Sequence, residues 1–150
     1  MRRNEATLYL LVGLPGSGKS TLAAEMVQKL PNAIRLCPES IAKEYDESIE
    51  SATEFALKWL NKAMLMGYDV IYDASNLTRE ERKEVLRWIP RPIDRTVAVV
   101  LGGNSEEDIE KALAGNSVER KHTEPEIIAL SKIYEVPEKS EGILTIVNVA

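Results

Sequence analysis

The residues best suited to chemistry lie near the start of the chain, where residues 13–20 read Gly-Leu-Pro-Gly-Ser-Gly-Lys-Ser. This stretch fits the pattern G-x-x-x-x-G-K-[ST], whose glycines let the backbone turn its N–H groups inward around phosphate oxygens. Lys19 would reach the β- and γ-phosphates of a nucleotide, and the hydroxyl of Ser20 would ligate Mg²⁺. The alternative is an ordinary glycine-rich turn. Because an apolar run precedes the stretch and a helical pattern follows it, the sequence favours a phosphate-binding loop.

The start of the helix that follows this loop would add partial positive charge to the phosphate site. We therefore expect the loop and the first helical turn to bind the nucleotide together. The residues expected to contact it there are Gly13, Pro15, Gly16, Ser17, Gly18, Lys19, Ser20 and Thr21.

A second group of polar residues follows the apolar run of residues 69–72. Asp73 ends that run, at the place where an acidic residue could orient magnesium or its bound water. An aspartate at the end of a strand also serves as a turn residue or a helix cap, and both interpretations remain open for Asp73. For Asn76 we expect a structural role, either a hydrogen bond to nearby backbone or an Asx-turn.

These residues need a scaffold, and the hydrophobic pattern predicts one with alternating strands and helices. Apolar runs predict strands, and helical spacing of apolar residues predicts helices. The expected strands are residues 7–12, 33–36, 69–72, 95–101 and 142–149, and the expected helices are residues 18–30, 40–66, 78–89, 105–116 and 124–134. Such an order implies a three-layer α/β fold with a parallel sheet of about five strands. The 150 residues are the size of one domain, residues 1–150.

The carboxyl ends of parallel strands meet at one rim, where ligands bind in sheets of this kind. This rim would bring together residues 13–20, the segment after Leu36 and the segment after Tyr72.

Two of the expected helices carry further local signals. Thr78 and Glu81 have the spacing of a capping box, and Gly67 would end the helix of residues 40–66. An apolar stripe is expected on that long helix. Its members are Ala52, Phe55, Ala56, Trp59, Leu60, Ala63 and Met64.

Composition and charge exclude several classes of protein. One cysteine and one histidine exclude a disulfide framework and a multi-cysteine zinc site. A net charge of −5 argues against a general basic field for binding nucleic acid, although a local basic groove stays open. There is no apolar run of membrane-spanning length, and the basic start of the chain leads into a strand rather than a signal peptide. We expect a soluble, cytoplasmic protein that does not bind membranes.

Three segments together resemble the kinase domain of the phage-type polynucleotide kinase family, part of a broader set of ATP-dependent P-loop kinases. They are residues 13–21 (GLPGSGKST), residues 70–82 (VIYDASNLTREER) and residues 116–128 (NSVERKHTEPEII), and the likeness spans residues 7–136. The resemblance implies a P-loop NTPase-type sheet with a helical lid, and ATP and Mg²⁺ as cofactors. It also implies transfer of the γ-phosphate to a hydroxyl acceptor, with the 5′-hydroxyl of a polynucleotide as that acceptor.

The resemblance also assigns roles to individual residues. The family's general base is an Asp after the second strand, where this sequence has Glu39; an ordinary first-turn acid is the other interpretation of Glu39. In the lid, Asn116 matches a nucleotide-binding position. Two family arginine positions fall on Gly115 and Glu119, and Arg120 follows one residue later. Arg120 is therefore either the lid arginine or part of a solvated helix end.

The resemblance thus predicts a catalytic set of Lys19, Glu39 and Arg120, with Ser20 and Asp73 at the metal. The acceptor is open, because Ala42 occupies the place of a basic residue that the family uses to hold nucleic-acid phosphate. A small-molecule or nucleoside kinase is one alternative. A nucleotide-binding regulatory module with little transfer activity is another.

For the two remaining reactive side chains the sequence favours passive roles. We expect His122 at the surface and Cys37 in a structural position at the end of a strand.

Overall fold

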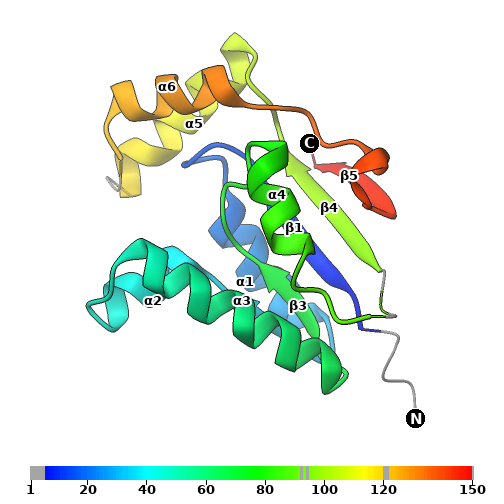
Figure 1. The fold of residues 1–150 in the computed structure, drawn as a ribbon. Helices are drawn as coiled ribbons and strands as arrows, with labels where there is room; N and C mark the ends of the chain where they lie inside the picture. Colours follow the sequence, from blue (N-terminus) through cyan, green and yellow to red (C-terminus); the bar gives the residue numbers. More distant parts are fainter. Residues whose placement is uncertain (1–5, 92, 94, 120–121, 150) are drawn as a thin grey trace.

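The computed structural model describes residues 6–91, 93, 95–119 and 122–149, and it contains a five-stranded sheet in which every neighbouring pair is parallel (Figure 1). The strand order is β2-β3-β1-β4-β5. The strands are β1 (Leu8–Val12), β2 (Ala33–Leu36), β3 (Asp69–Tyr72), β4 (Thr96–Leu101) and β5 (Thr145–Val149). The predicted parallel α/β sheet is therefore confirmed.

Helices cover both faces of this sheet. One face packs against α3 (Ile49–Leu65) and α4 (Arg79–Leu86), with Leu8, Leu10 and Val70 in the apolar layer between them. The other face packs against α1 (Lys19–Lys29), through Leu11 and Ile71 of the strands. Burial on both sides explains the continuous apolar runs of β1, β3 and β4, whereas the edge strand β5 is partly exposed along its whole length.

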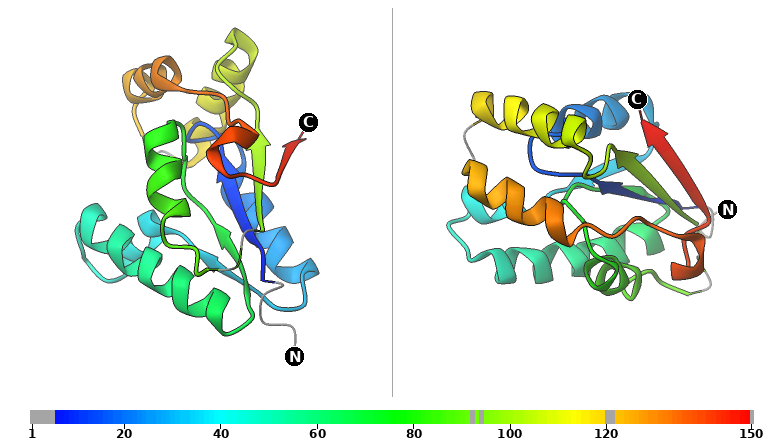
Figure 2. Two further views of the ribbon diagram at one scale, coloured as in Figure 1. Left: turned by 45° about the vertical axis from the view of Figure 1, so that its right-hand side comes forward. Right: turned by 90° about the horizontal axis from the view of Figure 1, so that it is seen from above.

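A third apolar cluster lies beyond the carboxyl ends of the strands, where α5 (Glu106–Glu119) and α6 (Glu124–Ile133) lie side by side (Figures 1 and 2). Ala112 of α5 and Ile127 of α6 pack there with Leu14 and Leu77. Leu14 belongs to the glycine-rich loop and Leu77 follows β3. The α5–α6 pair is thus anchored directly on the rim at which ligands bind in such sheets.

The expected single helix of residues 40–66 is wrong, because the structure has two helices there. They are α2 (Pro38–Glu44) and α3, separated by residues 45–48. Asp46 adopts a left-handed backbone with φ of 52°, which a continuous helix does not allow. The side chain of Ser48 then accepts a hydrogen bond from the backbone N–H of Ser51 at 3.1 Å and so starts α3 afresh.

The apolar stripe expected on this helix is only partly buried. Ala52, Ala56, Leu60, Ala63 and Met64 are in the core. Phe55 and Trp59 remain 49% and 42% exposed and pack edge to face on each other, with ring centroids 6.3 Å apart. The predicted stripe was therefore too wide, because these two positions lie beyond the edge of the face that meets the sheet.

The local signals expected at two helix ends are both present. The capping box of Thr78 and Glu81 is present at the start of α4, and Gly67 has the left-handed φ of 91° typical of a residue that follows a helix. The last strand begins at Thr145 rather than residue 142, because a short 3-10 turn (Lys139–Glu141) ends at Gly142 in a left-handed conformation.

Within the described ranges, every helix is too short or too polar to cross a bilayer.

Candidate functional site

A cavity of about 680 Å³ lies at the carboxyl ends of β2 and β3, beside the glycine-rich loop. The register of the sheet explains why its parts meet, because Leu36, Tyr72 and Leu10 form one row across β2, β3 and β1. Leu36 and Tyr72 end their strands, so the residues just after β2 and β3 lie side by side, and β1 continues to Val12 before the glycine-rich loop begins. Among the predicted site residues, those that line the cavity are Pro15, Gly16, Gly18, Lys19, Ser20, Glu39 and Asp73.

The loop has the backbone that a phosphate-binding loop needs. Gly16 and Gly18 have φ values of 88° and 99°, a left-handed conformation that side-chain-bearing residues rarely adopt. The ammonium group of Lys19 curls back over the loop and donates to the carbonyl oxygens of Gly13 and Leu14, at 2.9 and 3.0 Å. Lys19 is almost fully buried, and its positive charge lies over the loop at the cavity.

Ser20 and Asp73 converge in the way that the metal prediction requires. The hydroxyl of Ser20 donates to Oδ2 of Asp73 at 3.4 Å, and both residues line the cavity. Hydroxyl and carboxylate oxygens are the hard donors that Mg²⁺ takes, so these two residues fit the ion. Within the described ranges no set of three or more His, Cys, Asp or Glu side chains forms a metal site. A Mg²⁺ held largely by water and nucleotide phosphates does not need one.

Arg35 is a site residue that the sequence interpretation missed. Its guanidinium on β2 donates to Oδ2 of Asp73 from Nε at 2.9 Å and from Nη2 at 2.6 Å. This ion pair fixes the Asp73 carboxylate beside Ser20. The sequence did offer one signal for Arg35. It directly precedes Leu36, the last residue of a strand that ends at the same rim as Asp73.

The remaining predicted nucleotide-binding residues lie elsewhere. Gly13 contributes its carbonyl to Lys19, and Thr21 is exposed on α1. Ser17 faces a second, smaller cavity shared with Asp108, and its buried hydroxyl finds no hydrogen-bond partner among the residues that the structure describes. Arg120 lies outside the described residues.

Asn116 is buried and bonds to the backbone of His122 in both directions. Its Nδ2 donates to the carbonyl oxygen of His122, and its Oδ1 accepts from the N–H of His122 at 3.0 Å. Through this pair of bonds, Asn116 of α5 is joined to the backbone just before α6.

His122 is only partly exposed and lines the cavity. The expectation that it lies at the surface is therefore only partly correct. Its Nε2 lies 3.6 Å from a carboxylate oxygen of Glu39, and its Nδ1 lies 3.3 Å from Glu126. Hydrogen bonds from His122 and Thr123 lower the pKa of Glu126. His122 therefore connects the α5–α6 pair to the carboxylate proposed as base, a contact between segments far apart in the sequence.

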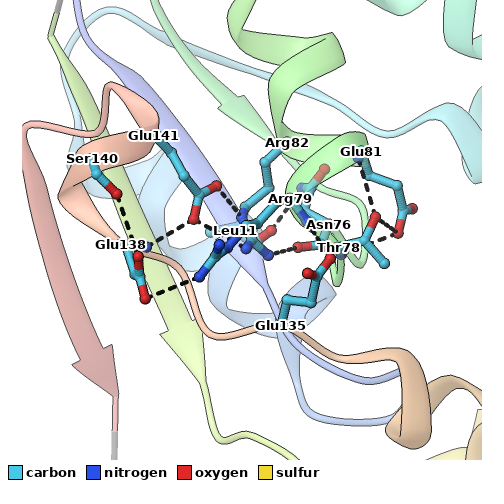
Figure 3. A network of polar contacts seen from close by, with 10 residues as sticks. All are labelled: Leu11, Asn76, Thr78, Arg79, Glu81, Arg82, Glu135, Glu138, Ser140 and Glu141. Carbon is cyan, nitrogen blue, oxygen red and sulfur yellow. Dashed lines mark hydrogen bonds and ion pairs between the residues drawn. The ribbon is translucent and has the colours of Figure 1, made fainter.

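Asn76 has the expected structural role. Its Nδ2 donates to the carbonyl of Leu11 in β1 at 2.7 Å, which ties the segment after β3 to the neighbouring strand (Figure 3). Nη1 of Arg82 donates to the carbonyl of Asn76 at 2.9 Å, and the same guanidinium is held by Glu141.

Cys37 precedes α2, and its Sγ accepts a hydrogen bond from Ser40 at 3.3 Å. These contacts stabilise the rim that carries Asp73 and Glu39.

The glycine-rich loop and α5 approach each other backbone to backbone. A Cβ on Gly115 would stand 2.1 Å from the carbonyl oxygen of Gly16, and a Cβ on Gly16 would meet the carbonyl oxygen of Ala112. Gly115 falls at one of the family's arginine positions, so this packing explains why the chain needs glycine there.

The family comparison agrees with this geometry, because a model for the AAA domain matches residues 8–127. The chain belongs to this AAA domain family. The match covers the sheet from β1 to β4, the glycine-rich loop and most of the α5–α6 pair.

Solved structures with the same fold include several kinases. A fungal RNA kinase superimposes with a TM-score of 0.69 at 14% identity, covering 97% of this chain and 74% of the other. A gluconokinase from Sinorhizobium meliloti 1021 gives 0.64 at 15% identity, with 99% and 83% covered. A chain of the Pnkp1/Rnl/Hen1 complex gives 0.61 at 20% identity, with 79% and 40% covered.

This chain spans less than half the length of the chains that it matches in the Pnkp1/Rnl/Hen1 complex. At these identities the likeness concerns the fold: this AAA domain protein has an α/β P-loop NTPase-like fold of the kind found in small kinases. The resemblance to P-loop kinases stated from the sequence is confirmed.

Proposed function

We propose that residues 1–150 act as a single ATP-dependent kinase domain that transfers the γ-phosphate to the hydroxyl group of an acceptor. The observation that carries the proposal is one cavity lined by both the glycine-rich loop and Glu39. Phosphoryl transfer requires mainly that donor and acceptor are positioned in line and that the phosphate charge is neutralised.

On the donor side, the loop N–H groups and Lys19 would bind the β- and γ-phosphates of ATP. To do so, Lys19 would exchange its bonds to the carbonyls of Gly13 and Leu14 for phosphate oxygens. Ser20 and Asp73 would hold Mg²⁺, which neutralises charge on the phosphates when it is bound. Arg35 would keep the Asp73 carboxylate oriented, and Arg120 is proposed as a lid cation.

On the acceptor side, Glu39 would accept the proton of the attacking hydroxyl. Its side chain is about half exposed at the start of α2 and lines the cavity, so an acceptor held there lies between Glu39 and the loop. Burial raises the pKa of Tyr72 strongly, with Cys37 and Glu81 adding to the shift, so its phenol stays protonated and can donate a hydrogen bond in the same cavity.

The resemblance and the fungal RNA kinase fold suggest a polynucleotide 5′-hydroxyl as acceptor, whereas the gluconokinase fold suggests a small molecule. Both belong to the same proposed reaction. The two classes of acceptor are distinguished by incubating the protein with γ-labelled ATP and pools of 5′-hydroxyl oligonucleotides, nucleosides and small hydroxyl compounds.

The variant that tests the role of Glu39 is Glu39→Gln, which keeps the shape of the side chain but cannot take the proton. We expect kcat to fall by about 10²–10⁴-fold, because that is the usual contribution of a general base. ATP affinity should stay within about threefold, because Glu39 is proposed to contact the acceptor and not ATP. The matched control is Glu44→Gln at the other end of α2, which leaves kcat unchanged. A Glu39→Gln variant as active as the parent would place the base elsewhere.

A second candidate is a nucleotide-binding module with little transfer activity. The observation in its favour is that Lys19 is the one Lys or Arg among the described residues that line the cavity, so the transferring phosphate has few cations around it. This candidate predicts retained ATP binding with no transfer to any acceptor in the same screen.

A further inference from the structure

The part of the cavity that is lined by α2, α3 and α4, which we call the acceptor half, carries negative charge. Such a charge does not suit a polyanionic acceptor. Four glutamates line this half: Glu39 from α2, and Glu80, Glu81 and Glu84 from α4. Lys19 lies at the phosphate loop, and no other Lys or Arg among the described residues lines the cavity. The nearby guanidinium groups of Arg35 and Arg87 are paired with Asp73 and Glu84. The only other basic side chain among the described lining residues is His122, which lies against Glu39.

The glutamates of α4 differ in how far they are already engaged. Glu81 belongs to the capping box, where its carboxylate accepts hydrogen bonds from the N–H and hydroxyl of Thr78. Glu84 forms an exposed ion pair with Arg87 at 3.1 Å, and exposed pairs of this kind contribute little to stability. Glu80 makes no ion pair with any described residue. Glu80 and Glu84 are four residues apart and so share one face of α4.

The floor of the same half is apolar. Leu57 of α3, Val85 of α4 and the ring of Tyr72 are buried and line the cavity, and Ile49 lies at its edge. A volume of about 680 Å³ that also has to hold nucleotide phosphates leaves room for a small molecule. Phosphates spaced along a polynucleotide would lie against the carboxylates of α4 and be repelled by them.

We propose that the acceptor is a small molecule that carries both a hydroxyl group and a protonated amine. The amine is bound by the carboxylates of Glu80 and Glu84, and the hydroxyl is directed towards Glu39. This assignment rests on the kinase function proposed above and names its substrate class.

In the transfer, the acceptor oxygen forms a bond to the γ-phosphorus of ATP while the bond from that phosphorus to the β–γ bridging oxygen breaks. ADP leaves with that oxygen. The hydroxyl proton passes to the Glu39 carboxylate and from there to solvent. The products are the phosphate monoester of the amino alcohol and ADP, so no further reactant is needed.

The test compares acceptors of similar size and different charge: glucosamine (cationic), glucose (neutral) and gluconate (anionic), each with other members of its class, and a 5′-hydroxyl oligonucleotide. Transfer from γ-labelled ATP is measured over a range of acceptor concentrations. We expect kcat/KM for the best cationic acceptor to exceed that of every neutral or anionic acceptor by at least about tenfold, because its charge is complementary to that of the four glutamates.

The double variant Glu80→Lys, Glu84→Lys reverses the charge of the proposed amine site. We expect kcat/KM for the cationic acceptor to fall at least about tenfold, mainly through KM, and kcat/KM for gluconate to rise. ATP affinity should not change. Should this variant fail to fold, as judged by circular dichroism, Glu80→Gln, Glu84→Gln replaces it with the same expected direction.

The matched control is Glu106→Lys, Glu110→Lys, which makes the same change of net charge at two exposed positions four residues apart on α5, outside the cavity. It should leave the order of acceptors unchanged. Efficient transfer to gluconate or the oligonucleotide in preference to cationic acceptors overturns the amine assignment and leaves the kinase proposal standing. ATP binding without transfer to any acceptor class overturns both.

Discussion

At the scale of single residues, the site depends on a few side chains whose charges are held by short contacts. Lys19 is buried over the loop and bonded to two of its carbonyls, and Asp73 is fixed between Ser20 and Arg35. Both arrangements provide hydrogen-bond partners for charged groups at the rim. Under the proposed function, the same groups would exchange these partners for the phosphates and the metal of a bound nucleotide.

Replacing Lys19 by alanine should separate binding from folding. We expect the Kd for ATP to rise at least about tenfold and transfer to be lost, because a charge-assisted contact to phosphate disappears. The free energy of unfolding should fall by about 1–3 kcal/mol, since hydrogen bonds from a charged group to loop carbonyls are lost while the apolar core is unchanged. Calorimetric titration with ATP and urea denaturation measure the two effects.

The control for this variant is Lys29→Ala, at the exposed end of the same helix. It removes the same charge without touching the loop, and ATP affinity should match the parent. If Lys19→Ala bound ATP as the parent does, residues 13–20 would not be the phosphate site.

At the scale of elements, the contact between α5 and the glycine-rich loop couples the position of the α5–α6 pair to the shape of the loop. The two backbones meet at Gly16 and Gly115, and Leu14 of the loop is buried in the apolar cluster of α5 and α6. A displacement of α5 therefore moves packing that supports the loop.

A Gly115→Ala variant tests this contact. In a helix interior, alanine in place of glycine normally stabilises by about 0.5–1 kcal/mol. Here the new Cβ would stand 2.1 Å from the carbonyl oxygen of Gly16, so α5 or the loop has to move. We expect a net destabilisation of about 1–3 kcal/mol, as for overpacking, together with weaker ATP binding. Thermal denaturation with and without ATP measures both.

Ser117→Ala, at an exposed position on the same helix, is the control and should leave ATP affinity unchanged. A Gly115→Ala protein that was more stable than the parent and bound ATP normally would show that α5 does not rest on the loop in solution.

The same scale explains what the sequence could and could not predict. The loop, Asp73 and the strands were predictable because each is marked by residues that are close together in the chain. Arg35 and His122 were not, since their contribution depends on contacts with distant segments. Glu84 was not, because its place at the cavity depends on how α4 packs in the fold. The break between α2 and α3 was missed because it rests on the backbone of Asp46, which leaves the surrounding helical pattern unchanged.

At the scale of the whole molecule, a buried ion pair connects the site to the C-terminal part of the chain (Figure 3). The guanidinium of Arg82 is fully buried and makes two bonds with Glu141, at 2.8 and 3.2 Å. Its third bond, to the carbonyl of Asn76, reaches the segment that follows Asp73. Around it, the backbone N–H of Arg79 donates to Glu135. The segment before β5 thus supports α4 and the rim.

A Glu141→Gln variant should therefore destabilise the whole protein. It leaves the buried charge of Arg82 without its counter-charge, and removing one partner of a buried pair costs about 3–5 kcal/mol. Because glutamine keeps one hydrogen bond, we expect the lower end of this range, about 3 kcal/mol at pH 7. Urea denaturation measures the loss. The control is Glu138→Gln in the same turn, which breaks a half-exposed pair with Arg79 and should cost at most about 1 kcal/mol.

The pH dependence of stability gives this prediction a second readout. Burial works to raise the pKa of Glu141, but the hydrogen bonds from Arg82 and from the backbone of Glu138, with the charges of Arg82 and Arg79, outweigh it and lower the pKa below its usual 4.5. A carboxyl whose pKa is lower in the folded state contributes its full stability above its unfolded-state pKa, and that contribution is lost as the pH falls through the folded-state pKa. The parent should therefore lose stability on acidification below about pH 4.5, and Glu141→Gln should lack this component of the loss. Denaturation curves collected between neutral and acidic pH would contradict the assignment if parent and variant lost stability in parallel.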